Sequence, residues 1–235
     1  MPLPALRALA LVLLYAVAGA VCVDAGEVTG TIHVTRALTR KRVPIVARAY
    51  QRGMAPAVAS AAGDWTELSR LAVYLDDGKV ARTASGATLS LTQKGRRFEP
   101  EVAVIRAGNS VEFPNFDPIV HNVFSLSKAK SFDLGYYPKG QTRSVRFDDP
   151  GIVSVYCHLH PNMSAAIVVA PGPWVARPDL AGDFAIPDVP EGRYTLVVWH
   201  KSAGFFRRRI TVERDGAVHA DIEIPVRAEP EAAGE

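Results

Sequence analysis

The sequence predicts an all-β protein that is built from two β modules behind an N-terminal export signal. Short segments of alternating or apolar residues recur along the chain, and clusters of Gly, Pro, Asn and Asp separate them. No helical repeat competes with this pattern between residues 86 and 170. About 210 residues follow the signal, which is enough for one large or two small domains.

Residues 1–25 are typical of a cleavable signal helix. Arg7 precedes a long apolar run that ends in small residues. Cleavage after Ala25 is favoured over cleavage after Ala20, because cleavage after Ala20 would leave an unpaired Cys22 near the new N-terminus. Lipidation of Cys22 and an uncleaved anchor are the alternatives, although the run is shorter than the roughly 20 residues of a spanning helix. We therefore expect a periplasmic or secreted protein without stable membrane insertion.

The charge balance is mild, with 27 Lys and Arg against 24 Asp and Glu. The basic runs at 40–42, 94–97 and 207–209 are interpreted as solvated faces, with a docking surface for an acidic redox partner as the sharper alternative. No nucleic-acid partner is expected after export. No Ser-His-Asp arrangement, phosphate-binding Gly loop or pair of acid/base carboxylates is recognisable, so we expect no catalytic residues and no enzyme activity.

Metal-binding residues are concentrated in residues 156–163, Tyr-Cys-His-Leu-His-Pro-Asn-Met. Cys157, His160 and Met163 stand within seven residues, and His121 lies 36 residues before the cysteine. One thiolate, two imidazoles and one thioether are the ligands of a blue-copper electron-transfer centre. Soft sulfur suits Cu(I) and imidazole suits either valence, so a rigid set lets copper change valence with little ligand movement.

Cys157 has no intramolecular disulfide partner if Cys22 leaves with the signal. In an oxidising compartment such a thiol is either buried and inert or bound to a metal. A buried Cys or Met alone is more often a core residue. The joint occurrence of the cysteine, the two histidines and the methionine favours copper.

The expected copper module covers residues 86–170. Its predicted strands are 102–105, 111–115, 121–125, 142–147, 151–156 and 165–169. Cys157 follows one strand directly, so it projects from a sheet end, while His160 and Met163 come from the turn into the next strand. Pro161 limits the freedom of this turn. The pattern therefore predicts a ligand loop with little slack.

Residues 88–170 resemble the cupredoxins. The nearest pattern is that of amicyanin, which has the same short Cys-x2-His-x2-Met spacing with Pro after the second histidine, whereas plastocyanin and pseudoazurin have longer loops. The match extends upstream to Phe98-Glu99-Pro100, to the Gly turn in residues 106–111, and to His121-Asn122-Val123. The resemblance implies a Greek-key β-sandwich that holds one type 1 Cu ion and carries single electrons by Cu(I)/Cu(II) cycling.

The resemblance also implies the role of each residue. Four atoms would bind copper, three equatorially and the last axially: His121 Nδ1, Cys157 Sγ, His160 Nδ1 and Met163 Sδ. Asn122 would tie the first histidine's strand to the ligand loop and donate a backbone hydrogen bond to the cysteine sulfur, and Pro161 would support the loop. His158 departs from the pattern, and we expect it to point away from copper in a structural role. A second metal site or a transient copper handover is its alternative.

The combination of a secreted cupredoxin with a further β module is similar to proteins of the methylamine-utilisation group. This resemblance implies a redox protein partner, such as a cytochrome or a dehydrogenase. Two other functions stay open at this point. One is copper delivery or assembly, and the other is a binding or scaffold protein with a secondary copper site.

Beyond a Pro-Gly-Pro linker, residues 174–226 resemble the carboxypeptidase regulatory-like, transthyretin-type β-sandwich, and residues 227–235 read as a tail. Two strands flank a Pro-x-Gly turn within residues 182–199, and segments 205–212 and 218–224 are expected to form the closing pair. His33, His200 and His219 are interpreted as ordinary sandwich residues.

About 50 residues are too few for a sandwich of this kind. Segments 28–34 and 71–75, within residues 26–85, are therefore expected to supply the missing strands. The hypothesis predicts main-chain pairing between these segments and strands after residue 180. The copper module would then be inserted into the second module.

Overall fold

The computed structural model describes residues 25–34, 67–81 and 87–224. Residues 1–24 of the expected signal peptide, with Cys22, lie outside these ranges, as do residues 36–66 and the expected tail 227–235, whereas Ala25, the favoured cleavage position, is the first described residue. The described chain consists of β-strands and one short 3-10 turn, η1 (Glu67–Arg70), which confirms the predicted all-β class. No helix among the described residues is long and apolar enough to cross a membrane.

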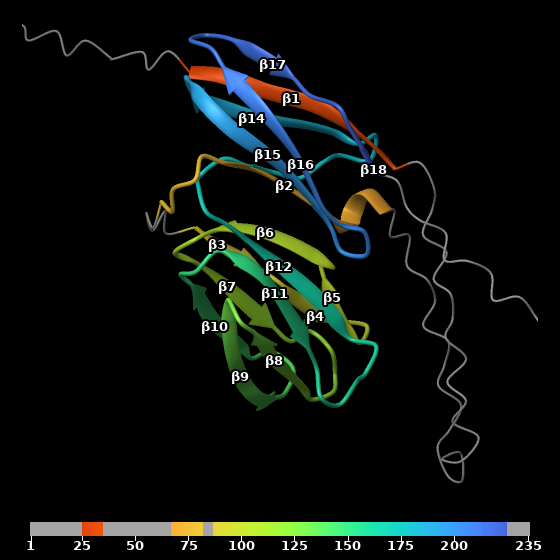
Figure 1. Cartoon of the computed structure of the whole chain (residues 1–235). Coiled ribbons are helices and arrows are strands. Elements are labelled where there is room, and N and C mark those ends of the chain that lie inside the picture. The colour runs from red at the N-terminus through yellow and green to blue at the C-terminus, as the bar shows by residue number, and fades with distance from the viewer. Residues whose placement is uncertain (1–24, 35–66, 82–86, 225–235) are drawn as a thin grey trace, which may run out of the picture.

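Residues 88–170 form a two-sheet sandwich, here named the inserted module (Figure 1). Its larger sheet has the order β6-β12-β11-β8-β9, with bounds β6 (Val102–Arg106), β12 (Ser164–Ala170), β11 (Gly151–Tyr156), β8 (His121–Ser127) and β9 (Lys130–Tyr137). The smaller sheet has the order β10-β7-β3, with bounds β10 (Thr142–Phe147), β7 (Asn109–Pro114) and β3 (Thr88–Ser90). A hairpin of β4 (Thr92–Lys94) and β5 (Arg97–Glu99) precedes β6.

Alternating side chains of the two sheets meet in one apolar core. Phe113 and Phe147 come from the smaller sheet, and Val123, Val153 and Ile167 come from the larger one. All five are buried. Because a strand directs every second side chain to the same face, this core fixes the register of both sheets.

The remaining strands form the host module, which is also a pair of sheets. One sheet has the order β14-β1-β17, with β18 also pairing β1, and its strands are β14 (Asp183–Pro190), β1 (Ala25–Val34), β17 (Ala217–His219) and β18 (Ile222–Ile224). The other has the order β13-β2-β15-β16, with strands β13 (Val175–Ala176), β2 (Leu71–Asp76), β15 (Gly192–His200) and β16 (Gly204–Val212).

The main-chain pairing predicted for the N-terminal segments is present. In β1, Val28 lies opposite Ile186 of β14, and in β2, Leu75 lies opposite Leu196 of β15. Both pairs are antiparallel. All strands of the inserted module lie between β2 and β13 in the sequence, so the host module is assembled from both sides of the insertion.

The predicted closing pair of the host module is wrong. Segment 205–212 pairs with β15, whereas segment 218–224 divides into β17 and β18, which both run parallel to β1 in the opposite sheet. The division between β17 and β18 lies at Ala220, where the chain passes close to Gly30 of β1. A Cβ atom at Gly30 would lie 2.2 Å from the carbonyl oxygen of Ala220. Asp221 then accepts a hydrogen bond from the amide of Thr31 at 2.9 Å.

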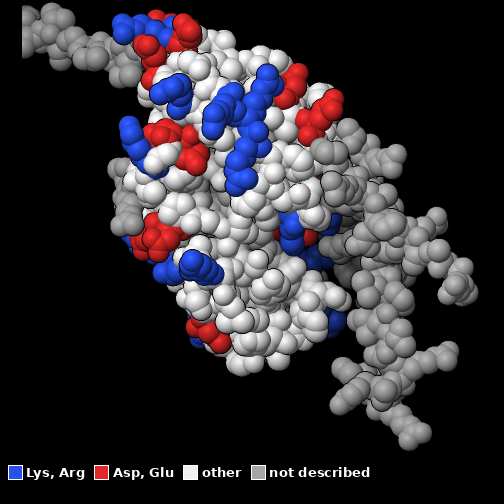
Figure 2. Space-filling model, viewed as in Figure 1, with Lys and Arg blue, Asp and Glu red and all other residues white. Residues whose placement is uncertain are grey.

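A second apolar layer joins the two modules. Ala72 of β2 and Trp199 of β15 pack against side chains of β6 and β12, namely Val102, Val104, Ala166 and Val168. The sheet that contains β15 is thus covered on both faces, which explains the continuous apolar run in residues 196–199. In Figure 1 the host module lies on one side of the inserted module, with β2 next to β6. On the face seen in Figure 2, acidic and basic side chains intermingle, most of them over the host module.

Candidate metal centre

Three potential metal donors converge at one end of the larger sheet of the inserted module. His121 is the first residue of β8, Cys157 follows β11, and His160 lies in the loop between β11 and β12. Strands β8 and β11 are neighbours, with Tyr156 opposite Phe124. Sheet pairing therefore brings together residues that are 36 positions apart in the sequence.

The donor atoms form a small triangle. His121 Nδ1 lies 3.1 Å from His160 Nδ1, and the Cys157 sulfur lies 3.8 Å and 3.6 Å from these two nitrogens. The point equidistant from the three atoms lies about 2.0 Å from each, and metal bonds measured for zinc are about 2.0–2.1 Å to imidazole and about 2.3 Å to thiolate. The triangle therefore has the size that a transition-metal ion requires.

Two of the three donor side chains are buried, and the third is partly exposed to solvent. His121 is fully buried and Cys157 is 4% exposed, while His160 is partly exposed. Cys157 forms no disulfide within the part of the chain that the structure describes. Among the described residues, this is the one group of three or more His, Cys, Asp or Glu side chains whose donor atoms gather in this way.

Asp117 sets the orientation of His121. Its carboxylate lies 2.8 Å from His121 Nε2, and it accepts backbone hydrogen bonds from Gly95 at 2.6 Å and Arg96 at 2.8 Å. The Nε2–H of His121 donates to the carboxylate, so its Nδ1 offers a lone pair toward the centre. Although burial opposes ionisation, the hydrogen bonds from Arg96, His121 and Gly95 lower the pKa of Asp117 below its usual value.

His160 also presents Nδ1 to the centre. Burial, together with the neighbouring His121 and Arg96, lowers the pKa of His160 below its usual value. A neutral imidazole is the form that binds a metal. The two Nδ1 atoms are close enough to share one proton, and a bound cation would take that proton's place between them.

The ligand loop is closed by a tight turn. Pro161 and Asn162 are its two central residues, and the amide of Met163 donates to the carbonyl of His160 at 2.8 Å. Proline favours this kind of turn because its φ angle is already fixed. The Met163 side chain is buried in the same core cluster as Cys157.

Asn122 connects the two ligand-bearing segments. Its side-chain oxygen accepts from the amide of His158 at 3.4 Å, and its side-chain nitrogen donates to Asp133 at 2.7 Å. Within the described chain, the polar contacts of the Cys157 sulfur are those with the two imidazoles. The expected hydrogen bond from the Asn122 amide to this sulfur is not seen.

His158 lies away from the three donors. Its ring stacks on Phe124, with ring centres 3.8 Å apart and an interplanar angle of 29°. The other histidines that the sequence singled out also lie elsewhere. His200 is buried with Nε2 3.1 Å from a carboxylate of Glu67, and His219 lies 3.0 Å from Asp221 on the surface of the host module.

The residue that sequence reasoning missed is Asp117. It stands four positions before His121 in Asn-Phe-Asp-Pro, which reads as an ordinary turn. Its two backbone donors come from the β4–β5 hairpin, and no local sequence pattern predicts that contact. An acidic residue just before a candidate ligand is the one signal that could have found it.

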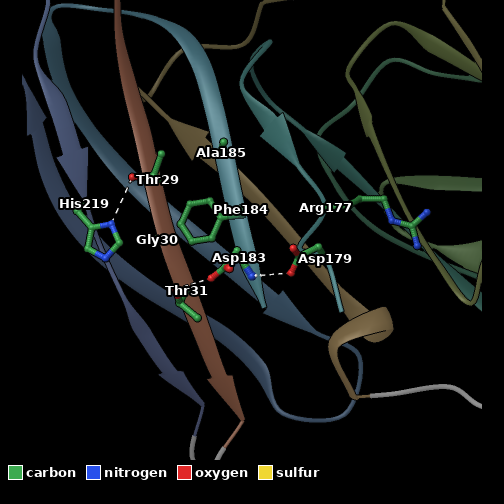
Figure 3. A pocket seen from close by; sticks show the side chains of 9 residues that line it. All are labelled: Thr29, Gly30, Thr31, Arg177, Asp179, Asp183, Phe184, Ala185 and His219. Atoms are coloured by element: carbon green, nitrogen blue, oxygen red, sulfur yellow. Dashed lines mark hydrogen bonds between the residues drawn. The ribbon is translucent and has the colours of Figure 1, made fainter. Parts of the chain in front are cut away.

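A second hollow lies in the host module, open to solvent (Figure 3). Its polar side chains bond to one another, since Thr31 donates to Asp183 at 2.6 Å and the Thr29 hydroxyl lies 3.3 Å from His219 Nδ1. The hollow therefore contains no converging set of unsatisfied groups comparable to the centre described above.

No protein-family model and no curated protein matches this sequence. Solved structures that are similar to part of this chain include a Cu-containing nitrite reductase, a purple cupredoxin and amicyanin. The Cu-containing nitrite reductase of Thermus scotoductus SA-01 is 24% identical over 37% of this chain, with a TM-score of 0.35, and this chain spans 23% of its length. A purple cupredoxin of Nitrosopumilus maritimus is 21% identical over 36% of this chain and 99% of its own, with a TM-score of 0.32. Reduced amicyanin is 20% identical over 42% of this chain and 98% of its own, with a TM-score of 0.33.

Proposed function

We propose that this protein belongs to the type 1, or blue, copper proteins. The observation that carries the proposal is the triangle of His121 Nδ1, Cys157 Sγ and His160 Nδ1, whose size and donor types fit one copper ion. Met163 is the proposed axial ligand, because it follows His160 in the loop and belongs to the same buried core cluster as Cys157. Copper bound there supplies a one-electron Cu(I)/Cu(II) couple.

Within that class, the proposed role is that of a periplasmic or secreted electron carrier without substrate chemistry. The protein's part is to hold the donors still. His121 is fixed by Asp117, Cys157 is held at a strand end, and the turn at Pro161 restrains His160. A donor set that stays in place in both valences keeps the reorganisation cost of electron transfer small.

Electrons are proposed to enter through the exposed edge of His160. The adjoining residues in the two ligand segments are apolar and exposed, since Leu159 is 50% and Val120 is 41% exposed. Exposed apolar side chains around a partly open ligand suit the docking of another protein. We propose a cytochrome or a dehydrogenase as that partner, in line with the resemblance to the methylamine-utilisation group.

The pairing of β1 and β2 with β14 and β15 supports a related proposal for the host module. We take it to be one complete regulatory-like β-sandwich that contains the copper module as an insertion. The second sheet of this sandwich contacts the copper module through its outer face.

Copper delivery is the second candidate function. It is favoured by the partial exposure of His160, which would let an incoming ligand of another protein reach the metal. A delivery protein gives up Cu(I) readily to an acceptor chelator of moderate affinity. A carrier retains copper through repeated oxidation and reduction, and this is the outcome we expect.

The test of the proposed function is spectroscopic. The copper-loaded mature protein should show an intense visible charge-transfer band and the narrow copper splitting of a type 1 centre in paramagnetic resonance, and Cys157→Ser should abolish the band. His158→Ala is the matched control, because this neighbouring ring stacks on Phe124 and should leave the band in place. Copper uptake without any such band would refute the proposal.

A further inference from the structure

A chain of buried and partly buried titratable groups crosses the boundary between the two modules. From η1 come Glu67 and Arg70, from the segment before β6 comes Glu101, and from the end of β15 and its turn come His200 and Lys201. Arg70 and Glu101 are each 8% exposed, and His200 is fully buried. Electron transfer as proposed above makes no use of any of them.

Glu101 is the central member of this chain. Its two carboxylate oxygens accept from different cations, one from Lys201 Nζ at 2.7 Å and the other from Arg70 Nε at 3.1 Å. Both cations belong to the host module, whereas Glu101 belongs to the inserted module. The carboxylate thus has one positive partner on each oxygen.

Lys201 also reaches the base of the ligand loop. Its Nζ lies 3.4 Å from both the carbonyl and the hydroxyl oxygen of Ser164. Ser164 directly follows Met163 and lies opposite Tyr156, the residue before Cys157, in the β11–β12 pair. The whole loop therefore leaves the sheet at the residue pair to which Lys201 is attached.

The two cations differ in the group that each contacts besides Glu101. Arg70 Nε binds Glu101 and its Nη1 lies 3.6 Å from Glu67. Lys201 binds the same carboxylate but also contacts Ser164. Buried ion pairs often add little net stability, and a role in holding one arrangement is a hypothesis to be tested case by case.

From this geometry, and resting on the proposed function, we infer that Lys201 is a positioning residue by which the host module holds the Met163 end of the copper-ligand loop. Through the contact of Lys201 with Ser164, the host module limits how far Met163 can move from the triangle. A weak axial thioether leaves the site nearly trigonal, so the position of Met163 tunes the reduction potential.

The experiment compares Lys201→Met with Arg70→Met. Each variant removes one positive charge and one partner of Glu101, but only the first removes the contacts to Ser164. Loss of positive charge near the centre favours Cu(II) and lowers the potential, whereas a receding thioether favours Cu(I) and raises it. We expect Lys201→Met to shift the Cu(II)/Cu(I) equilibrium about tenfold toward Cu(I), which raises the reduction potential by about 59 mV. We expect Arg70→Met to lower the reduction potential.

A copper-free measurement tests the same contact. In the apo protein, the amide of Met163 should exchange its hydrogen about tenfold faster in Lys201→Met than in Arg70→Met, because only the first loosens the loop base. Lys201→Arg keeps the charge and the donors, so it should restore both the potential and the exchange rate toward those of the wild type.

Equal effects of the two Met variants on the potential and on the exchange rate would overturn the inference, since they would trace to the shared loss of charge. Failure of the proposed function looks different. The wild type would then show no type 1 spectrum, while hydrogen exchange in the copper-free variants would still report whether Lys201 holds the loop.

Discussion

Asp117 gives the fully buried His121 a defined tautomer, in which Nδ1 keeps a lone pair directed to the candidate metal centre. The carboxylate that accepts from the His121 ring is itself held in place by two backbone amides. Partners of this kind raise the basicity of the ligand and fix its direction.

Replacing this carboxylate should weaken metal binding. We expect Asp117→Asn to lower copper affinity by about 10–100-fold, because the amide no longer selects the Nε2–H tautomer of His121. Competition against a chelator of known affinity measures the loss. Asp133→Asn is the matched control, since Asp133 bonds to Asn122 and not to the proposed copper ligands. Equal losses of copper affinity in the two variants would show that Asp117 has no specific role in orienting His121.

The axial position offers a second test at the level of one side chain. Met163→Gln should lower the reduction potential, because an amide oxygen is a stronger axial donor to Cu(II) than a thioether. Met163→Leu removes the donor and should raise the potential. A redox titration followed at the charge-transfer band measures both shifts. Identical potentials in the two variants would remove Met163 from the ligand set.

Among the elements, strands with regular alternation or a continuous apolar run were predictable, and strands with neither pattern were not. Alternation or an apolar run in the sequence correctly predicted strands β6, β8, β10, β11 and β12. Strand β9 was missed. Its burial alternates weakly, it lies at the sheet edge, and Gly135 interrupts it at a φ of 64°. Strands β6 and β10 also lie at sheet edges, but they carry regularly buried apolar side chains, so the weak apolar face of β9 is what hid it from the pattern.

The crossing of β1 and the segment between β17 and β18 makes a prediction about stability. A methyl group at Gly30 would lie 2.2 Å from the carbonyl oxygen of Ala220, which is backbone and cannot move alone. Gly30→Ala should therefore lower the free energy of unfolding by about 1–3 kcal/mol, as measured by urea denaturation. At Gly172 the nearest atom would be 3.4 Å away, so Gly172→Ala should have little effect. A neutral Gly30→Ala variant would mean that β1 and Ala220 are not in contact.

For the molecule as a whole, the candidate donor set could be recognised in the sequence, because the donor types and their short spacing are local. The insertion was also predictable, since 50 residues could not complete a sandwich and the missing apolar segments stood upstream. The contacts that join the modules were not predictable. Lys201 and Glu101 lie 100 positions apart, and nothing in the residues around either one indicates the other.

Charge pairing at the module boundary should make stability depend on pH. Burial opposes the ionised form of Glu101, but Lys201 and Arg70 outweigh it, so the pKa of Glu101 lies below its ordinary value of 4.5. The ion pairs of Glu101 therefore contribute their full stabilisation at a pH above the ordinary pKa of the carboxyl group. This contribution is lost as the pH falls through the lowered pKa of Glu101 in the folded protein. Glu101→Gln should reduce the loss of stability between neutral pH and pH 3, measured as the shift in the urea midpoint.

The control for that measurement is Asp148→Asn, which removes one acid from an exposed pair with Arg146. Exposed pairs contribute little to stability. Its urea midpoints should follow those of the wild type at every pH. If Glu101→Gln behaved in the same way, the boundary charges would have no part in acid unfolding.

The first and last described strands, β1 and β18, lie side by side in one sheet of the host module. A mechanical pull applied through the two ends of the described chain is thus taken up by the hydrogen bonds between these neighbours. The strands of the inserted module do not carry this force. A tether at either end, to an envelope or to another protein, would leave the geometry of the metal centre unstrained.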